Sequence, residues 1–138
     1  MADLAVTKTQ VQPGENAVFS SGIAGQTIIQ GQNLYLEAET QTWKLADCNA
    51  SVQMARTQAT AISEAVAGQV VSLIIGGTII LGAAAAPVKG TIYVQSGTPG
   101  GWKPAADLAS GDNVTLVGVG DGQLGVQTFY NFTDIALP

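Results

Sequence analysis

The chain has 138 residues, no histidine, one cysteine and a net charge of −5, and only 11% of its residues are charged. This length fits one domain whose core needs no disulfide or metal. The five scattered basic residues do not form the clustered positive patch that nucleic-acid binding requires. The lack of histidine removes Ser-His-Asp and Cys-His catalysis and the usual zinc ligand sets.

The first 25 residues favour an N-terminal arm or an edge strand. Leu4, Val6 and Val11 alternate with polar residues until Pro13-Gly14, which predicts a turn. The segment has neither a basic leader nor an apolar stretch, so we expect no secretory signal. Short strands are expected next, at Ala17–Phe19 and Thr27–Ile29.

One motif occurs twice, within residues 31–59 and 90–119. In each copy a tyrosine after a glycine precedes a Trp-Lys pair, by eight residues in the first copy and nine in the second, and an aspartate follows. This predicts a duplicated hairpin, with Leu34–Ala38 pairing Thr42–Ala46 in the first copy. Core packing of each Tyr and Trp across its hairpin is the favoured interpretation, and a sugar-stacking platform is the alternative. The equivalent positions are Tyr35 and Tyr93, Trp43 and Trp102, and Asp47 and Asp107.

The middle of the chain predicts a strand at Val52–Ala59 and a loop or single helical turn at Ala61–Ala67, which Gly68 ends. The uncharged residues 65–88 are numerous enough to cross a bilayer. Two β-branched runs around Gly76-Gly77 favour a hairpin of Val70–Ile75 and Thr78–Leu81 instead. We therefore expect no contact with a membrane.

The remaining elements complete an all-β prediction. Strands are expected at Thr91–Gln95, Val114–Val119 and Val126–Phe132, with one helical turn after Pro104 and a tail at 133–138. Residues 120–125 match the string G-x-G-x-x-G, but a strand follows, so a hairpin turn is predicted and not a dinucleotide site. The expected domain is a small barrel or sandwich over residues 26–132, with at most short helical turns.

Few residues are candidates for metal binding. Glu37 and Glu39 share one face of a predicted strand, and Asp107 and Asp112 flank a loop. Solvated like charges and turn capping explain both pairs more simply. Cys48 is expected to be a small buried side chain. The sequence therefore predicts no cofactor, and no enzymatic activity.

The order of these motifs resembles the small capsid decoration, or cement, proteins of tailed bacteriophages. The resemblance covers about residues 26–125. Its most specific part is the tyrosine of the second repeat followed by Pro-Ala-Ala-Asp-Leu-Ala-Ser-Gly-Asp at 104–112 and Leu116-Val-Gly-Val119. The two ends of the chain do not share it.

This resemblance implies a β-rich, non-enzymatic protein that forms homotrimers on the outer surface of the virion. Its partner would be the major capsid (coat) protein, and it would be made in the host cytoplasm. The low charge agrees, since a surface poor in Lys and Glu suits repeated contact with other protein. A carbohydrate-binding module using Trp43 and Trp102, or a fibre or tail accessory protein, remain alternatives.

Two sets of contact residues are predicted. An N-terminal arm would dock on the coat protein, and the uncharged Val70–Leu81 segment would form the seam between copies. The candidate capsid contacts are Leu4, Val6, Lys8 and Val11, and the candidate seam residues are Val71, Leu73, Ile75 and Ile79.

Overall fold

A computed structural model describes residues 3–138 and confirms the all-β prediction. Two short 3-10 turns are present, η1 (Lys8–Gln10) and η2 (Ala105–Asp107), the second at the helical turn expected after Pro104. The strands are β1 (Gln12–Pro13), β2 (Val18–Ile23), β3 (Asn33–Leu36), β4 (Trp43–Leu45), β5 (Ala59–Ala61), β6 (Val70–Ile80), β7 (Ile92–Gln95), β8 (Trp102–Pro104), β9 (Asn113–Gly120) and β10 (Gly125–Ala136).

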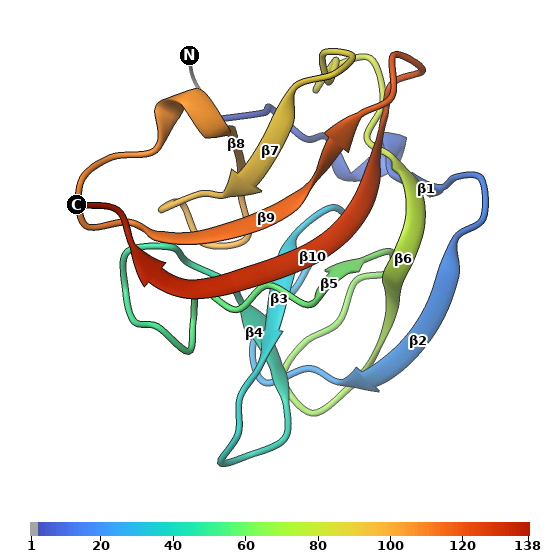
Figure 1. The fold of residues 1–138 in the computed structure, drawn as a ribbon. Helices are drawn as coiled ribbons and strands as arrows, with labels where there is room; N and C mark the ends of the chain where they lie inside the picture. The colour runs from blue at the N-terminus through green and yellow to red at the C-terminus, as the bar shows by residue number, and fades with distance from the viewer. Residues whose placement is uncertain (1–2) are drawn as a thin grey trace.

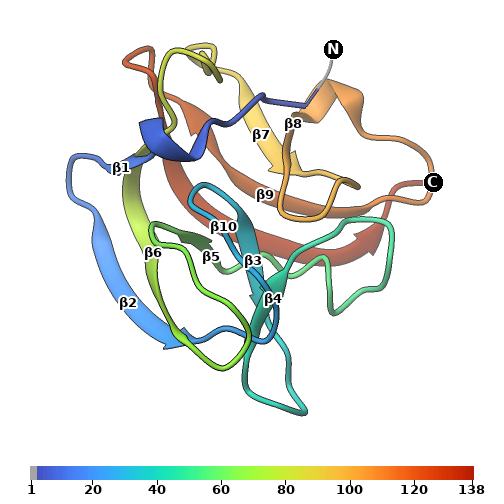
Figure 2. The ribbon, with the colours of Figure 1, turned by 180° about the vertical axis from the view of Figure 1, so that it is seen from behind.

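These strands form one antiparallel sheet that curls into a half-barrel (Figures 1 and 2). The strand order is β4-β3-β5-β6-β10-β9-β7-β8, and β1 and β2 pair with β6 in addition. Buried side chains form two clusters, one centred on Leu34, Val71 and Leu73 and the other on Tyr93 and Trp102. The long strand β6 contributes to both clusters and so joins the two halves.

The hairpin expected around Gly76-Gly77 is wrong, because residues 70–80 form one continuous strand. Its first half pairs with β2, and its second half pairs with β1 and β10. Gly77 has a φ of +79°, and a Cβ there would lie 2.1 Å from the carbonyl oxygen of Asn16. The glycine pair therefore lets a neighbouring backbone approach a bent strand, which is a recurrent use of glycine inside a strand.

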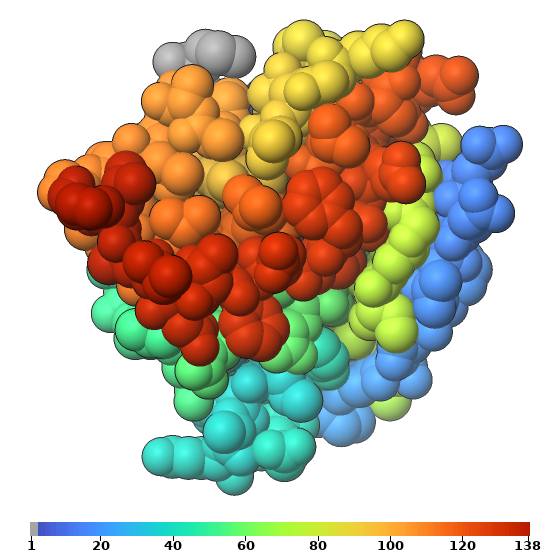
Figure 3. Space-filling view, in the orientation of Figure 1, coloured from blue at the N-terminus to red at the C-terminus, as the bar shows by residue number. Residues whose placement is uncertain are grey.

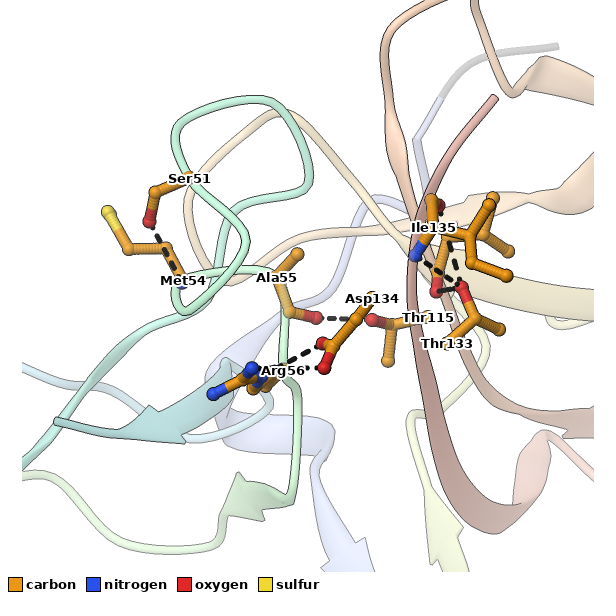
Figure 4. Close-up of polar contacts among 9 residues, drawn as sticks. Ser51, Met54, Ala55, Arg56, Thr115, Thr133, Asp134 and Ile135 are labelled. Carbon is orange, nitrogen blue, oxygen red and sulfur yellow. Dashed lines mark hydrogen bonds and ion pairs between the residues drawn. The ribbon is translucent and has the colours of Figure 1, made fainter. Parts of the chain in front are cut away.

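Two other element boundaries differ from expectation. Residues 52–55 form turns, held by Met54 N–H donating to Ser51 Oγ at 3.1 Å, and β5 begins only at Ala59. Residues 133–136, expected in a tail, continue β10. Figure 4 shows why this end is ordered: Arg56 donates two hydrogen bonds to the Asp134 carboxylate, at 2.8 and 2.9 Å.

The hairpin turn expected in place of a dinucleotide loop is confirmed, because β9 ends at Gly120 and pairs antiparallel with β10, which begins at Gly125. Asp121 Oδ1 accepts hydrogen bonds from the N–H groups of Gln123 and Gly125. Across the described residues, no helix is long and apolar enough to cross a membrane.

The N-terminal segment packs on the domain, so the expectation of a separate arm is wrong. Leu4, Val6 and Val11 contact the cluster around Trp102, and Leu4 N–H donates to the Trp102 carbonyl at 2.9 Å. Lys8 pairs with the carboxylate of Glu64. The alternating apolar residues of this segment therefore lie on one face, and that face covers the core.

Deleting residues 2–12 should lower the stability of the domain. Removing three part-buried aliphatic side chains from the core cluster should cost about 2 kcal/mol or more, because that apolar surface returns to water. Chemical denaturation of the truncated and full-length proteins measures the loss. Lys8→Ala is the matched control, since its exposed ion pair should matter little. Unchanged stability after the deletion would contradict the observed packing.

Candidate interaction surfaces

The duplicated motif forms two hairpins, β3–β4 and β7–β8. In the first, Tyr35 lies opposite Lys44 and Trp43 lies opposite Leu36. Opposed residues share a face of a sheet and successive residues alternate, so the ring of Tyr35 and the ring of Trp43 lie on opposite faces. The expected packing of Tyr against Trp is therefore wrong for this copy.

The second hairpin places its two aromatic rings on one face. Tyr93 lies opposite Pro104, and Trp102 lies opposite Gln95, two residues along from Tyr93. Both rings belong to the same buried cluster. The single extra residue between Tyr93 and Trp102 is the physical reason for the difference, because a shift of one residue moves a side chain to the other face.

The two tryptophans accordingly have different surroundings. Trp102 is 1% exposed, and its indole N–H donates to the Gly31 carbonyl at 2.8 Å. Trp43 is half-buried, and its indole lies over Gly22, where an added Cβ would be 2.3 Å from Nε1. With the Trp102 ring enclosed, the pair cannot form a common surface for stacking a sugar.

Both repeat lysines form ion pairs, and the two differ in burial. Lys44 Nζ lies 2.9 Å from Glu37 at a part-exposed site, whereas Lys103 Nζ lies 2.6 Å from Asp112 Oδ2 with both side chains at most 10% exposed. Cys48 is fully buried near this second pair, and burial raises the pKa of its thiol to about 11. The thiol is therefore protonated at neutral pH.

In the Lys103–Asp112 pair, the pKa of each side chain is shifted in the direction that favours its charged form. Burial alone would raise the pKa of Asp112, but hydrogen bonds from Lys103 and the Ala109 N–H hold it below its ordinary value. Burial would likewise lower the pKa of Lys103, and the bond to Asp112 holds it above its ordinary value. Asp112 is thus committed to an internal ion pair.

Two of the four carboxylates considered for metal binding are held in ion pairs: Glu37 accepts from Lys44 and Thr40, and Asp112 accepts from Lys103. Asp107 lies in η2. The repeat aspartate of the first copy, Asp47, caps a turn by accepting from the Asn49 N–H at 3.0 Å. Among residues 3–138, no group of three or more His, Cys, Asp or Glu side chains could hold a metal ion.

Most predicted contact residues point into their own chain. Val71, Leu73 and Ile79 are fully buried, so they have no side-chain surface for the seam between copies for which they were candidates. Ile75 alone of that set is well exposed, at 42%. Of the candidate capsid contacts, Leu4, Val6 and Val11 cover the core, and Lys8 lies exposed beside Glu64.

The structure exposes two apolar surfaces that sequence reasoning missed. One follows β2 and the start of β6, and the other follows the second half of β10, which crosses the face seen in Figure 3. The sequence signal for the first surface was the uncharged run from Asn16 to Leu36, which contains the exposed Val18, Phe19 and Ile23. The exposed residues are Val18, Phe19, Ile23, Val70 and Ile75 on the first surface and Phe129, Phe132 and Ile135 on the second.

Several buried polar side chains were also missed. Thr60 Oγ1 donates to Asn33 Oδ1 at 2.7 Å, and Gln95 Nε2 donates to the Ala46 carbonyl at 2.8 Å. Tyr130, the tyrosine outside the repeats, brings its hydroxyl within 2.7 Å of Thr60 Oγ1. The two bonds of Thr60 tie β5 to β3 and β10, and the Gln95 bond ties β7 to the residue after β4.

Comparison with protein families, with curated proteins and with solved structures finds no match to this chain.

Proposed function

We propose that this protein is a non-enzymatic capsid decoration protein of a tailed bacteriophage. It would bind the major coat protein on the outer surface of the virion, as a homotrimer, and stabilise the shell by bridging neighbouring coat subunits. The observation that carries the proposal is the ordered series of motifs over residues 26–125, which resembles that family.

The surface chemistry supports the same role. The domain presents apolar side chains on two sheet faces and few charges, which suits repeated contact with protein. Several weak contacts made at once by an oligomer hold it firmly through effective concentration. The negative net charge would also limit adhesion to packaged DNA.

A carbohydrate-binding module is the weaker candidate, because the enclosed Trp102 cannot stack on a sugar. A fibre or tail accessory protein shares the β-rich architecture and would bind other virion parts than the shell.

Thermal disruption of shells tests the stabilising role. Expanded capsids of the encoding phage that lack this protein should rupture at a higher temperature once it is added, because every bound copy must be released before subunits separate. Shells treated with the heat-denatured chain are the control. An unchanged rupture temperature at saturating protein would refute the cement role.

A further inference from the structure

We propose that copies of this chain join head to tail, with the β2 surface of one packed against the β10 surface of the next, and that three such contacts close the trimer. The β2 surface is the set of exposed apolar side chains on β2 and the first half of β6, and the β10 surface is the set on the second half of β10. Their residues are Val18, Phe19, Ile23, Val70 and Ile75 on the first and Phe129, Phe132 and Ile135 on the second. The inference rests on the proposed homotrimer and assigns its contacts.

A ring of three identical chains needs two different surfaces on every copy. Rotation by a third of a turn brings one surface of a copy against a different surface of the next, whereas a two-fold axis brings a surface against itself. The two ribbon views place β2 and the end of β10 on opposite sides of the molecule (Figures 1 and 2). Two separate apolar surfaces on one chain therefore meet the requirement of a ring.

The β2 surface is a face of the sheet. Ile23 lies opposite Val70, and both side chains are exposed. The adjacent pair, Gly22 and Val71, alternates to the inner face, where Val71 is fully buried. At the end of β2, β4 pairs with Ala24 and covers the outer edge of the strand there. What remains accessible is the outer face of two strands that contain no charged residue.

The charges on the β10 surface are already paired. The charged residue in β10, Asp134, accepts two hydrogen bonds from Arg56 (Figure 4). The same guanidinium lies over the ring of Phe132, 5.8 Å from its centroid. Aromatic rings and arginine are enriched at protein interfaces, where lysine and glutamate are depleted. The two charged groups neutralise each other, so this surface suits contact with uncharged protein.

A second copy of this chain is the partner that the charges favour. The chain has a net charge of −5, so two copies repel each other wherever unpaired carboxylates come close. The β2 surface carries no charge and the β10 surface carries one internal ion pair, so their contact brings no unpaired charges together. Packing either surface on the acidic remainder of another copy would instead desolvate carboxylates, which is costly.

The size of the two surfaces favours a closed ring over an isolated pair. A stable protein interface involves about 20–30 residues on each side. The β2 surface offers five large apolar side chains and the β10 surface three, so a single contact of this kind is weak. In a ring every copy uses both surfaces, and the last contact forms between chains that are already held together at a high effective concentration. The trimer should therefore be far more stable than a dimer.

Charge substitutions test both surfaces. At a concentration where the parent is a trimer in sedimentation equilibrium, Phe19→Asp and Ile135→Asp should each leave chiefly monomer, because each buries an unpaired carboxylate in every contact. The two side chains are 59% and 66% exposed, so the fold should be kept, which circular dichroism checks. If Phe19→Asp does not fold, Val70→Asp replaces it on the same surface. The matched control, Val88→Asp, changes an exposed valine outside both surfaces and should stay trimeric.

The outcomes of this experiment separate the contact from the oligomer. A trimer that survives the change on either surface would overturn the head-to-tail contact and leave the homotrimer standing. A monomeric parent would overturn the homotrimer and the contact with it, while binding of that monomer to shells would still support the capsid role.

Cysteine pairs distinguish a head-to-tail contact from a two-fold one. Ser21 is exposed on β2, and Asn131 is exposed on β10 between Phe129 and Phe132. The double variant Ser21→Cys with Asn131→Cys should give covalent trimers with a bis-maleimide, because each copy offers a different thiol to each neighbour. Either single variant should give no covalent dimer. The native Cys48 is buried and its thiol protonated, so it should not react.

Two results of the cross-linking would contradict the proposal. Absence of covalent trimers from the double variant, or equal yields of covalent dimer from a single variant, would overturn the head-to-tail contact. Cross-linking of Ser21→Cys chiefly to coat protein on shells would also overturn it, and would assign the β2 surface to the coat instead.

Discussion

Trp102→Ala should lower the free energy of unfolding by about 3–5 kcal/mol. The indole is 1% exposed within the cluster that joins β6, β7, β8 and β9, so its removal leaves a cavity that the curved sheet cannot easily fill. The change also leaves the Gly31 carbonyl without its indole donor. Urea titration followed by circular dichroism measures the loss.

Trp43→Ala is the matched control from the other copy of the motif. Its indole is half-buried at the edge of the first cluster, so a clearly smaller loss is expected. Equal losses from the two changes would mean that the extra residue in the second hairpin does not set the burial of its tryptophan.

Lys103→Met should cost about 3–5 kcal/mol at neutral pH, because it leaves the Asp112 carboxylate buried without its cation. The pKa of Asp112 is lowered in the folded protein, so its contribution to stability is present above its unfolded pKa and is lost as the pH falls through the folded value. The pKa of Lys103 is raised in the folded protein, so its contribution to stability is present below its unfolded pKa and is lost as the pH rises through its folded pKa. The parent should therefore keep the full benefit of the pair at neutral pH.

The pH dependence separates the ion pair from simple packing. The difference in unfolding free energy between parent and Lys103→Met should shrink in acid, where Asp112 becomes protonated in both proteins. Lys103→Met combined with Asp112→Asn should lose less than either change alone, because no charge is left buried. Lys44→Met, which breaks the part-exposed equivalent pair, should have a far smaller effect. A difference that is constant from acid to neutral pH would contradict this electrostatic account.

The sequence predicted the fold class and the hairpins because their signals are local. Alternating apolar residues, β-branched runs and the Asp121-Gly122 turn each report the conformation of a few neighbouring residues, and most of the strands they predict are present. The exceptions are Thr27–Ile29, which forms no named strand, and Val52–Ala59, of which only Ala59 lies in a strand. The duplicated motif likewise located β3–β4 and β7–β8.

The errors arose where distant contacts decide the structure. Gly76-Gly77 looks like a turn, but its backbone is placed by the approach of Asn16, which lies about sixty residues away in the chain. The N-terminal alternation gave no indication of what it covers, and Leu4, Val6 and Val11 reach a cluster formed by residues 74–126. The Lys103–Asp112 pair resembled ordinary loop charges because burial is a property of the whole fold.

The most direct test of the capsid role is the binding of purified protein to empty expanded capsids that lack it. Shells with bound protein are separated from free protein by sedimentation, and the two chains are quantified in the pellet. We expect saturable binding with a stoichiometry near one copy per coat subunit, as required of a protein that bridges neighbouring subunits over the whole shell. Absence of binding, or a few copies per shell at saturation, would contradict the account, and the second outcome would point to a tail or fibre position.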